Sequence, residues 1–154
     1  MAQEALDEPA QGRFEGGEHR FPLRIYFEDT DLSGVVYHAN YLRFLERARS
    51  DMLRAAGIDQ RAAIENGTGG YAIADLSIRY RAPARLDDAL LVLSRVGETR
   101  AASCVIHQRV MRGAETLADA SVTAAFLSPA GRPRRQPGAW IDAFARLQRE
   151  DGST

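Results

Sequence analysis

One long helical pattern, set between segments of strand character, most constrains how this 154-residue chain can fold. From about Asn40 to Ala56, apolar residues recur with the helical period and form one stripe, and polar residues form another. The apolar stripe consists of Tyr41, Leu45, Ala48 and Met52, and the polar stripe consists of Arg43, Arg47, Ser50 and Arg54. We therefore expect one face of this helix to be buried and the other to be solvated.

Strand patterns lie on both sides of this helix. The segment Arg20–Phe27 precedes it and alternates apolar residues up to Phe27. Four longer runs follow it: Tyr71–Arg81, Ala89–Gly97, Ala101–Met111 and Thr116–Leu127. Short connections of hairpin length, at Gly97–Arg100 and Arg112–Ala114, join the last three runs. These runs are therefore predicted to pair as an antiparallel meander.

A single antiparallel sheet has one face that needs cover, and the long helix is the strongest cover in the sequence. The pattern therefore predicts an α+β fold, with five strands wrapped around one central helix. A short helix is expected at Gln60–Asn66, and an amphipathic helix from about Trp140 to Leu147 is expected to pack on the outside. We find no internal repeat, so residues 19–148 are expected to form one domain, between a disordered N-terminal tail at 1–18 and a C-terminal tail at 149–154.

Composition excludes several classes of function. The formal net charge of −1 gives no electrostatic reason to expect nucleic-acid binding. Every basic residue is Arg, which excludes a Lys Schiff base and a Walker-type phosphate loop within this chain. The single Cys104 lies in an apolar run, where a buried thiol is the expected state. The N-terminus lacks the features of a secretory signal and no apolar run is long enough to cross a bilayer, so we expect a cytoplasmic protein without an integral membrane segment.

The segment Phe27–Arg49, FEDTDLSGVVYHANYLRFLERAR, places an acidic loop, a Gly turn and a His-Ala-Asn helix start close together. The N–H groups in the first turn of a helix lack internal partners, so they can hold negative charge that develops on a substrate oxygen. Gly34 permits a sharp turn after the acidic residues, and Gly57 permits a left-handed helix stop. A carboxylate aimed at such a helix start suits acyl transfer.

The motifs DTD, VYHANY and ERAR in this segment, followed by YRAPARLDD at Tyr80–Asp88, closely resemble those of YbgC-type acyl-CoA thioesterases. These enzymes belong to the hotdog superfamily, which includes the 4-hydroxybenzoyl-CoA thioesterases, and the resemblance covers about residues 20 to 145. It implies a sheet curved around a central helix and a homodimer or homotetramer with active sites between subunits. It also implies hydrolysis of an acyl-CoA, with acyl carrier protein as the alternative carrier and with no metal or cofactor.

The resemblance assigns catalysis to Asp31, as nucleophile or general base, although an isolated Asp after a strand is more often a turn or cap residue. Glu28 and Asp29 match acidic positions with a structural or electrostatic role. Three carboxylates within four residues repel one another, which is expected to raise their affinity for protons.

Glu46 is the rival acid, since some other hotdog thioesterases carry their carboxylate on the central helix. An ion pair with Arg49 or Arg43 is the simpler explanation for this residue, so we rank it below Asp31.

His38 would by default be a half-buried polar residue near a helix start. The resemblance places it in the thioester site, where an imidazole can polarise water, orient the carboxylate or donate to the carbonyl oxygen. Tyr37, His38, Ala39 and Asn40 form the helix start whose backbone N–H groups are the expected oxyanion donors, and Asn40 is also the candidate N-cap. Some relatives place a Tyr where this chain has Phe27, which leaves the substrate range open.

A basic cluster follows the last strand. Arg132, Arg134 and Arg135 would ordinarily form part of a solvated loop. Guanidinium groups also suit the phosphates of coenzyme A, and resembling enzymes place phosphate contacts here. Arg79 and Arg81, at alternate positions of one strand, are weaker candidates for the same contact.

Two other functions remain open. A hotdog hydratase or dehydratase would share the fold and the coenzyme A surface, but the DTD loop argues against it. A non-catalytic protein that binds acyl thioesters is the other alternative, as a partner of the Tol-Pal envelope machinery or of phospholipid synthesis. Release of thiol from an acyl-CoA separates these possibilities.

Overall fold

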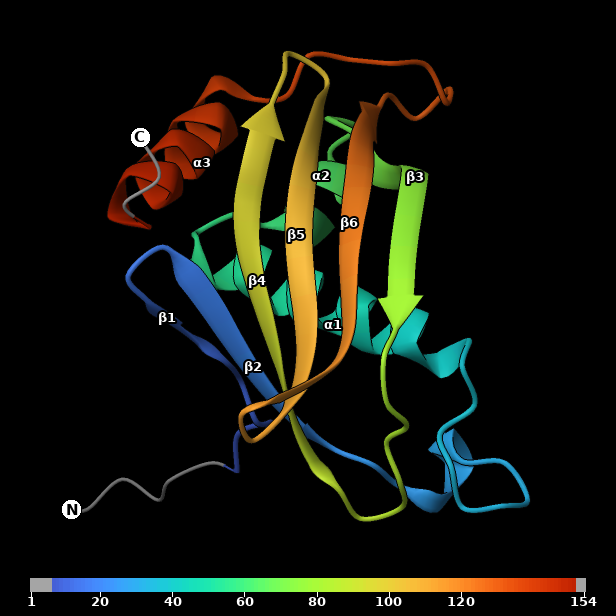
Figure 1. Ribbon diagram of the computed structural model, residues 1–154. Helices are drawn as coiled ribbons and strands as arrows, with labels where there is room; N and C mark the ends of the chain where they lie inside the picture. Colours follow the sequence, from blue (N-terminus) through green and yellow to red (C-terminus); the bar gives the residue numbers. More distant parts are fainter. Residues whose placement is uncertain (1–6, 152–154) are drawn as a thin grey trace, which may run out of the picture.

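The computed structural model describes residues 7–151, which form an antiparallel sheet, three α-helices and one 3-10 helix (Figure 1). The strands are β1 (Arg13–Glu15), β2 (Glu18–Arg24), β3 (Gly70–Tyr80), β4 (Ala89–Thr99), β5 (Ser103–Arg112) and β6 (Glu115–Leu127). The helices are η1 (Phe27–Asp29, 3-10), α1 (Asn40–Ala55), α2 (Gln60–Glu65) and α3 (Gly138–Glu150). The sheet order is β1-β2-β4-β5-β6-β3, so the predicted α+β class is confirmed, with six strands in place of five.

The additional strand, β1, lies inside the segment that we expected to be a tail. It pairs with β2 through a tight turn, in a register that places Phe14 opposite His19. The two rings pack edge to face, with centroids 5.2 Å apart. Residues 1–6 and 152–154 of the two expected tails lie outside the described residues, and α3 extends to Glu150, into the segment expected to be the C-terminal tail.

The first predicted strand also ends earlier than expected. Ile25 is fully buried, but Phe27 is 81% exposed because the chain turns into η1 after β2. The apolar alternation that reaches Phe27 therefore continues past the real end of the strand.

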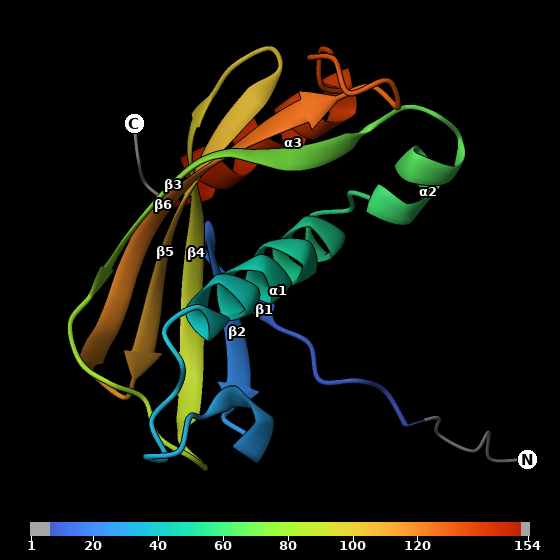
Figure 2. The same cartoon turned by 90° about the vertical axis from the view of Figure 1, so that its right-hand side faces the viewer.

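The sheet curves around α1, which crosses its concave face (Figure 2). The predicted apolar stripe of α1 is buried, and Tyr41, Leu45 and Ala48 pack with residues of β4, β5 and β6 in one core cluster. The C-terminal half of α1 joins a second cluster that includes Phe144 and Leu147 of α3. Our expectation that the C-terminal helix packs on the outside is therefore wrong, because its apolar face completes the core.

Polar groups also connect α1 to the sheet. Gln108 of β5 is almost fully buried and donates to the backbone oxygen of Leu45 at 3.0 Å and to Ser94 Oγ at 2.9 Å. Its side-chain oxygen accepts a hydrogen bond from Arg49 Nη1 at 3.0 Å. Since breaking one member would leave buried partners unpaired, this network fixes the position of α1 on the sheet.

A second buried link joins β2 to the C-terminal half of α1. His19 is fully buried, and its Nε2 lies 2.8 Å from Asp51 Oδ2, which also accepts a hydrogen bond from the Gly12 N–H at 2.8 Å. A side chain at Gly12 would collide with the backbone oxygen of Arg20, so the chain needs glycine at this close approach. Burial lowers the pKa of His19, although the hydrogen bond and charge of Asp51 act in the opposite direction.

We expect the protein to lose stability as the pH falls from about 7.5 to about 5.5. The unfolded chain takes up a proton on His19 near its ordinary pKa of 6.5, whereas the folded chain resists it, so protonation favours unfolding. Urea unfolding at both pH values measures the effect. His19→Gln should flatten the pH dependence of stability. The pKa of His107 is lowered too, so His107→Gln measures the separate contribution of that residue. An equal pH dependence in His19→Gln and the parent would contradict the assignment.

Candidate active site

The acidic loop between η1 and α1 is a tight, hydrogen-bonded turn. The Asp31 N–H donates to the backbone oxygen of Val35 at 2.9 Å, and the Gly34 N–H donates to the backbone oxygen of Asp31 at 3.2 Å. Gly34 has a φ of 79°, in the left-handed region that glycine adopts without strain. The predicted Gly turn is therefore present, and it holds Asp31 at the surface.

The Asp31 carboxylate is exposed and receives two hydrogen bonds from one residue. Its Oδ1 accepts from the Ser33 hydroxyl at 2.6 Å and from the Ser33 N–H at 2.8 Å. These bonds lower the pKa of Asp31, with the hydroxyl making the largest contribution. The expectation that neighbouring carboxylates raise its proton affinity is wrong for Asp31, because the Ser33 bonds dominate. The group is a carboxylate at neutral pH.

Asp29 connects the acidic loop to the helix start. Its Oδ2 accepts from the Tyr26 N–H at 2.9 Å, and its backbone oxygen accepts from the Tyr37 N–H at 3.0 Å and from Asn40 Nδ2 at 2.9 Å. Our prediction that Asn40 is the N-cap is therefore wrong. The N-cap position is Ala39, which makes no side-chain capping bond, and Asn40 is the first helical residue.

The helix start offers fewer free donors than expected. The Tyr37 N–H is bonded to Asp29, and the Asn40 N–H donates to the backbone oxygen of Tyr37 at 2.9 Å. Within residues 7–151, the N–H groups of His38 and Ala39 have no hydrogen-bond partner. These two adjacent donors stand at the positive end of the α1 dipole, so they can hold an anionic oxygen.

Three tyrosines support His38 and the helix start. The Tyr80 hydroxyl donates to the backbone oxygen of His38 at 2.8 Å, and the Tyr37 and His38 ring centroids lie 4.7 Å apart. The Tyr41 hydroxyl accepts from the Ala84 N–H at 3.0 Å. Our sequence analysis missed Tyr80 and Ala84 as supports. Their signal is the motif YRAPARLDD, which carried the resemblance but gave no role to its members.

The two sequence motifs are in direct contact. The Val36 N–H donates to the backbone oxygen of Ala84 at 2.9 Å, which joins the segment before α1 to the segment after β3. Arg112 holds the second segment in place through hydrogen bonds to Asp88 Oδ2 at 2.8 Å and to the backbone oxygen of Pro83 at 3.1 Å. The imidazole of His38 is exposed, and among the described residues it forms no hydrogen bond with Asp31.

Glu46, the rival acid, lies on the exposed side of α1. Within residues 7–151 it forms no direct ion pair, because Arg49 hydrogen-bonds Gln108. The charge of Glu46 still acts on Arg49, where it opposes the lowering of the Arg49 pKa by burial, so the predicted pairing with Arg49 is present only as this longer-range attraction. Glu46 lines a cavity of about 240 Å³ between α1 and the sheet. Tyr71, Ile73 and Cys104 contribute to the cavity wall, and burial raises the pKa of the Cys104 thiol to about 11.

The three arginines after β6 lie on an exposed loop. Arg134 Nη1 donates to the backbone oxygens of Gly67 at 3.0 Å and Thr68 at 2.8 Å, which ties this loop to the loop before β3. The side chains of Arg132 and Arg135 have no partner in the described part of the chain. In Figure 1 this loop lies at one end of the sheet and the Asp31 loop lies at the other. A single chain therefore does not bring these two predicted parts of the site together.

Two negative findings concern the described part of the chain. No group of three or more His, Cys, Asp or Glu side chains in residues 7–151 is placed to hold a metal ion. Among the helices of these residues, none has both the length and the apolar character needed to span a membrane.

Comparison with known proteins shows the family to which the chain belongs. Residues 33–119 match the model of the thioesterase superfamily, which covers more than half of the chain. The chain belongs to this superfamily. It is 43% identical over 105 residues to acyl-CoA thioesterase YbgC of Haemophilus influenzae, which covers 68% of this chain and 77% of that protein. It is 38% identical over 127 residues to acyl-CoA thioester hydrolase YbgC of Escherichia coli, which covers 81% and 94%.

The structure is also similar to a solved structure. A crystal structure of a probable thioesterase from Bartonella henselae is 35% identical, with a TM-score of 0.74, and the match covers 78% of this chain and 99% of that one. The predicted membership of the YbgC-type branch and the hotdog fold are therefore confirmed.

We expect Ser33→Ala to raise the pKa of Asp31. The substitution removes the hydroxyl bond that contributes most to the lowered pKa and keeps the backbone bond. Carboxyl ¹³C NMR across a pH titration measures the change, and Asp31→Asn assigns the signal. Thr30→Ala is the control, because the Thr30 hydroxyl bonds the backbone oxygen of Phe27 and should leave Asp31 unchanged. An unaltered titration in Ser33→Ala would contradict this account.

Proposed function

We propose that this protein is an acyl-CoA thioesterase that hydrolyses its substrate to a free acid and coenzyme A. The observation that carries the proposal is the ionised, exposed Asp31 carboxylate beside a helix start with two free N–H groups. Hydrolysis of a thioester needs a nucleophile or base together with donors for the oxyanion, and this loop supplies both kinds of group. Membership of the thioesterase superfamily supports the reaction class.

Asp31 acts on the thioester carbonyl by one of two routes. As a nucleophile, a carboxylate oxygen attacks the carbonyl carbon, the C–S bond breaks with departure of the thiolate, and water then hydrolyses the anhydride. As a general base, the carboxylate takes a proton from water, whose oxygen attacks instead. The Ser33 bonds lower the pKa of Asp31, which keeps the group ionised, as both routes require.

The backbone N–H groups of His38 and Ala39 stabilise the oxyanion in either route, because they are the free donors at the start of α1. The His38 imidazole is exposed beside the Tyr37 ring, where it can contact substrate or water. Tyr80 acts through His38, since its hydroxyl holds the His38 backbone oxygen and so orients the donors.

A complete site needs two copies of the chain. The Asp31 loop and the Arg132 loop lie at opposite ends of the sheet (Figure 1). The strand β3 forms one end of the sheet order, and its outer side is unpaired within residues 7–151. Antiparallel pairing of β3 with β3 of a second copy removes this exposed edge and places opposite ends of the two copies side by side. We therefore propose a homodimer, or a homotetramer built from it, that combines Asp31 of one copy with Arg132 and Arg135 of the other.

We assign the acyl group to the cavity beside Glu46, whose wall includes Tyr71, Ile73 and Cys104 and which lies next to the β3 edge. Coenzyme A is the carrier that we propose, because Arg132 and Arg135 have side chains free to bind its phosphates. Acyl carrier protein is the alternative carrier, and a substrate panel followed as free thiol compares the two. We expect the enzyme in the cytoplasm, together with this substrate.

We expect Asp31→Asn to lower kcat by on the order of 10³ or more, because it removes the charge required of a nucleophile or base. Glu46→Gln, at the rival acid, should keep kcat within about threefold of the parent, since our mechanism gives Glu46 no chemical role; its place in the wall of the acyl cavity bears on KM instead. His38→Ala should fall between them. Thiol release from acyl-CoA is the assay, and each variant must melt close to the parent.

An active Asp31→Asn together with an inactive Glu46→Gln would move the site to the central helix. If the parent releases no thiol at concentrations where acyl-CoA binds, a binding role replaces the proposed catalysis.

Mixed dimers test the composite site. One chain carries Asp31→Asn and the other carries Arg132→Ala with Arg135→Ala, which alone should raise KM by roughly tenfold with little change in kcat. If Asp31 and the arginines come from different copies, the mixed dimer contains one intact site and recovers about half the parent activity at the parent KM. If each copy holds its own complete site, the only active site has the raised KM. A monomer with full activity would also contradict the proposal.

A further inference from the structure

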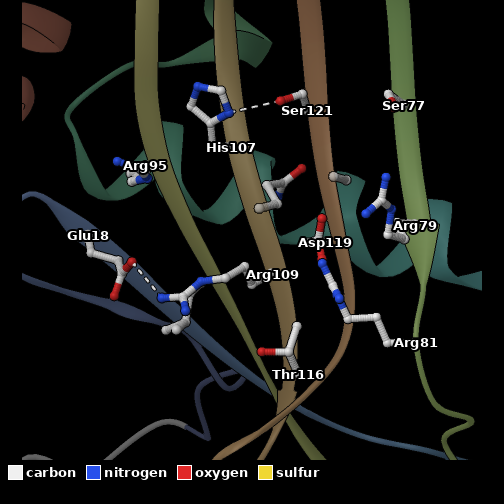
Figure 3. Close-up of a pocket in the computed structure, with 13 residues that line it drawn as sticks. Glu18, Ser77, Arg79, Arg81, Arg95, His107, Arg109, Thr116, Asp119 and Ser121 are labelled. Atoms are coloured by element: carbon white, nitrogen blue, oxygen red, sulfur yellow. Dashed lines mark hydrogen bonds and ion pairs between the residues drawn. The ribbon is translucent and has the colours of Figure 1, made fainter.

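The face of the sheet opposite α1 is uncovered within residues 7–151. Both α1 and α3 contribute to core clusters on the other face, and in Figure 3 the ribbon of α1 lies behind the sheet. On this outer face, side chains of β2 to β6 line a hollow of about 670 Å³. This volume is within the range of small-molecule sites in proteins. The hollow includes Arg79 and Arg81, the weaker sequence candidates for a coenzyme A contact, but none of the residues to which the proposed function gives a role.

The strand register places polar side chains in two adjacent rows. In one row, Arg79 of β3 pairs with Asp119 of β6, which pairs with Arg109 of β5. In the next row, Ser77 pairs with Ser121, then His107, then Arg95. Because neighbouring strands lie about 4.8 Å apart, the backbone positions of Arg79 and Arg109 are separated by roughly 10 Å. The long guanidinium side chains can therefore converge on one ligand from both sides.

The hollow has an excess of positive charge. Four guanidinium groups line it, from Arg79, Arg81, Arg95 and Arg109, against two carboxylates. Asp119 pairs with Arg81 at 2.5 Å, and Glu18 pairs with Arg109 at 3.5 Å.

The other two guanidinium groups are less constrained. Arg95 lies 4.0 Å from Asp151, and Arg79 has no partner among the described residues. A solvated sheet face needs polar residues, but it does not need this local surplus of one sign.

His107 lines the upper part of the hollow in Figure 3, level with Ser121, so its titration is sensitive to the charge in the hollow. Its Nδ1 lies 2.8 Å from Ser121 Oγ, and the chain has glycine at position 97, where a Cβ would come within 2.7 Å of His107 Nε2. The pKa of His107 is lowered by burial and, secondarily, by the positive charge of Arg95. The charged groups that line the hollow with His107 are Glu18, Arg79, Arg81, Arg95, Arg109 and Asp119, and Asp151 is paired with Arg95.

We propose that this outer-face hollow is a second ligand site, which binds a small anion carrying two or more phosphate groups. Arginine forks recognise phosphate oxygens, and the hydroxyls of Ser77 and Ser121 supply further donors. The wall contains no aromatic ring other than the imidazole, so recognition rests on the phosphates and not on stacking of a base. The site stands independently of the proposed thioesterase activity.

Inorganic pyrophosphate and tripolyphosphate are the probes, titrated into the full-length protein at low ionic strength. Isothermal calorimetry measures affinity, and NMR of the imidazole C–H signals measures the pKa of His107, with His107→Gln assigning the resonance. Bound phosphate should raise the pKa of His107 and bind more tightly as the pH falls. The double variant Arg79→Ala, Arg109→Ala should weaken binding by roughly tenfold or more, because it removes the two guanidinium groups on either side of the hollow.

The matched control is Arg43→Ala with Arg47→Ala, which removes the same charge from exposed positions of α1 and should leave binding unchanged. Equal weakening in both double variants, or an unshifted His107 signal at saturating pyrophosphate, would overturn the site. Thioesterase kinetics separate the ligand from the substrate. We expect the outer-face double variant to keep the parent KM, and a raised KM would instead assign the hollow to the phosphates of the substrate.

Discussion

Burial of one face of α1 against the concave side of the sheet is the interaction on which the rest of the structure depends. Tyr41, Leu45 and Ala48 are at most 2% exposed, and each fully buried large apolar side chain contributes about 1.5 to 3 kcal/mol. Apolar contact alone leaves a helix free to slide or rotate. The bonds of Gln108 to Leu45 and Arg49 remove that freedom, so the start of α1 has one defined position.

The proposed active site depends on that position more than on its own side-chain contacts. Backbone atoms make most of the bonds that hold the site, including those between Val36 and Ala84 and between Tyr37 and Asp29. The helix start and the acidic loop are thus fixed by the chain itself, while Asp31 and the His38 imidazole remain exposed. Such an arrangement leaves side chains around the site free to vary with the substrate, without loss of the oxyanion donors.

Most of the helices and strands could be predicted because the residues that define them, such as the apolar stripe of α1, are close together in the sequence. The helical period places α1 within one residue of its observed end, and the run Thr116–Leu127 matches β6 apart from one residue. Strand β1 escaped prediction because it has three residues and only one apolar side chain, Phe14. The amphipathic pattern of α3 showed that one face is buried but could not show against what, since Phe144 meets residues far away in the sequence.

The proposed active site also has features that local sequence predicts and features that it does not. The motifs around Asp31 and His38 lie in one segment, so the turn and the helix start could be predicted from it. The bond from Tyr80 to the His38 backbone spans 42 positions, and no local pattern encodes it. The hydrogen bond of Arg49 to Gln108 spans 59 positions, and it takes the place of the direct ion pair that helix spacing suggested for Glu46.

The length of β6 has a consequence for how such enzymes can diverge. Its 13 residues extend about 40 Å, from the hairpin near Asp88 to the loop that carries Arg132. The length of β6 therefore sets the distance between the hairpin near Asp88 and the loop that carries Arg132. Inserting two residues would preserve the alternation of faces yet shift one end by roughly 7 Å. Loops can change freely in evolution, but β6 is paired on both sides, so it can change length only if β5 and β3 change with it.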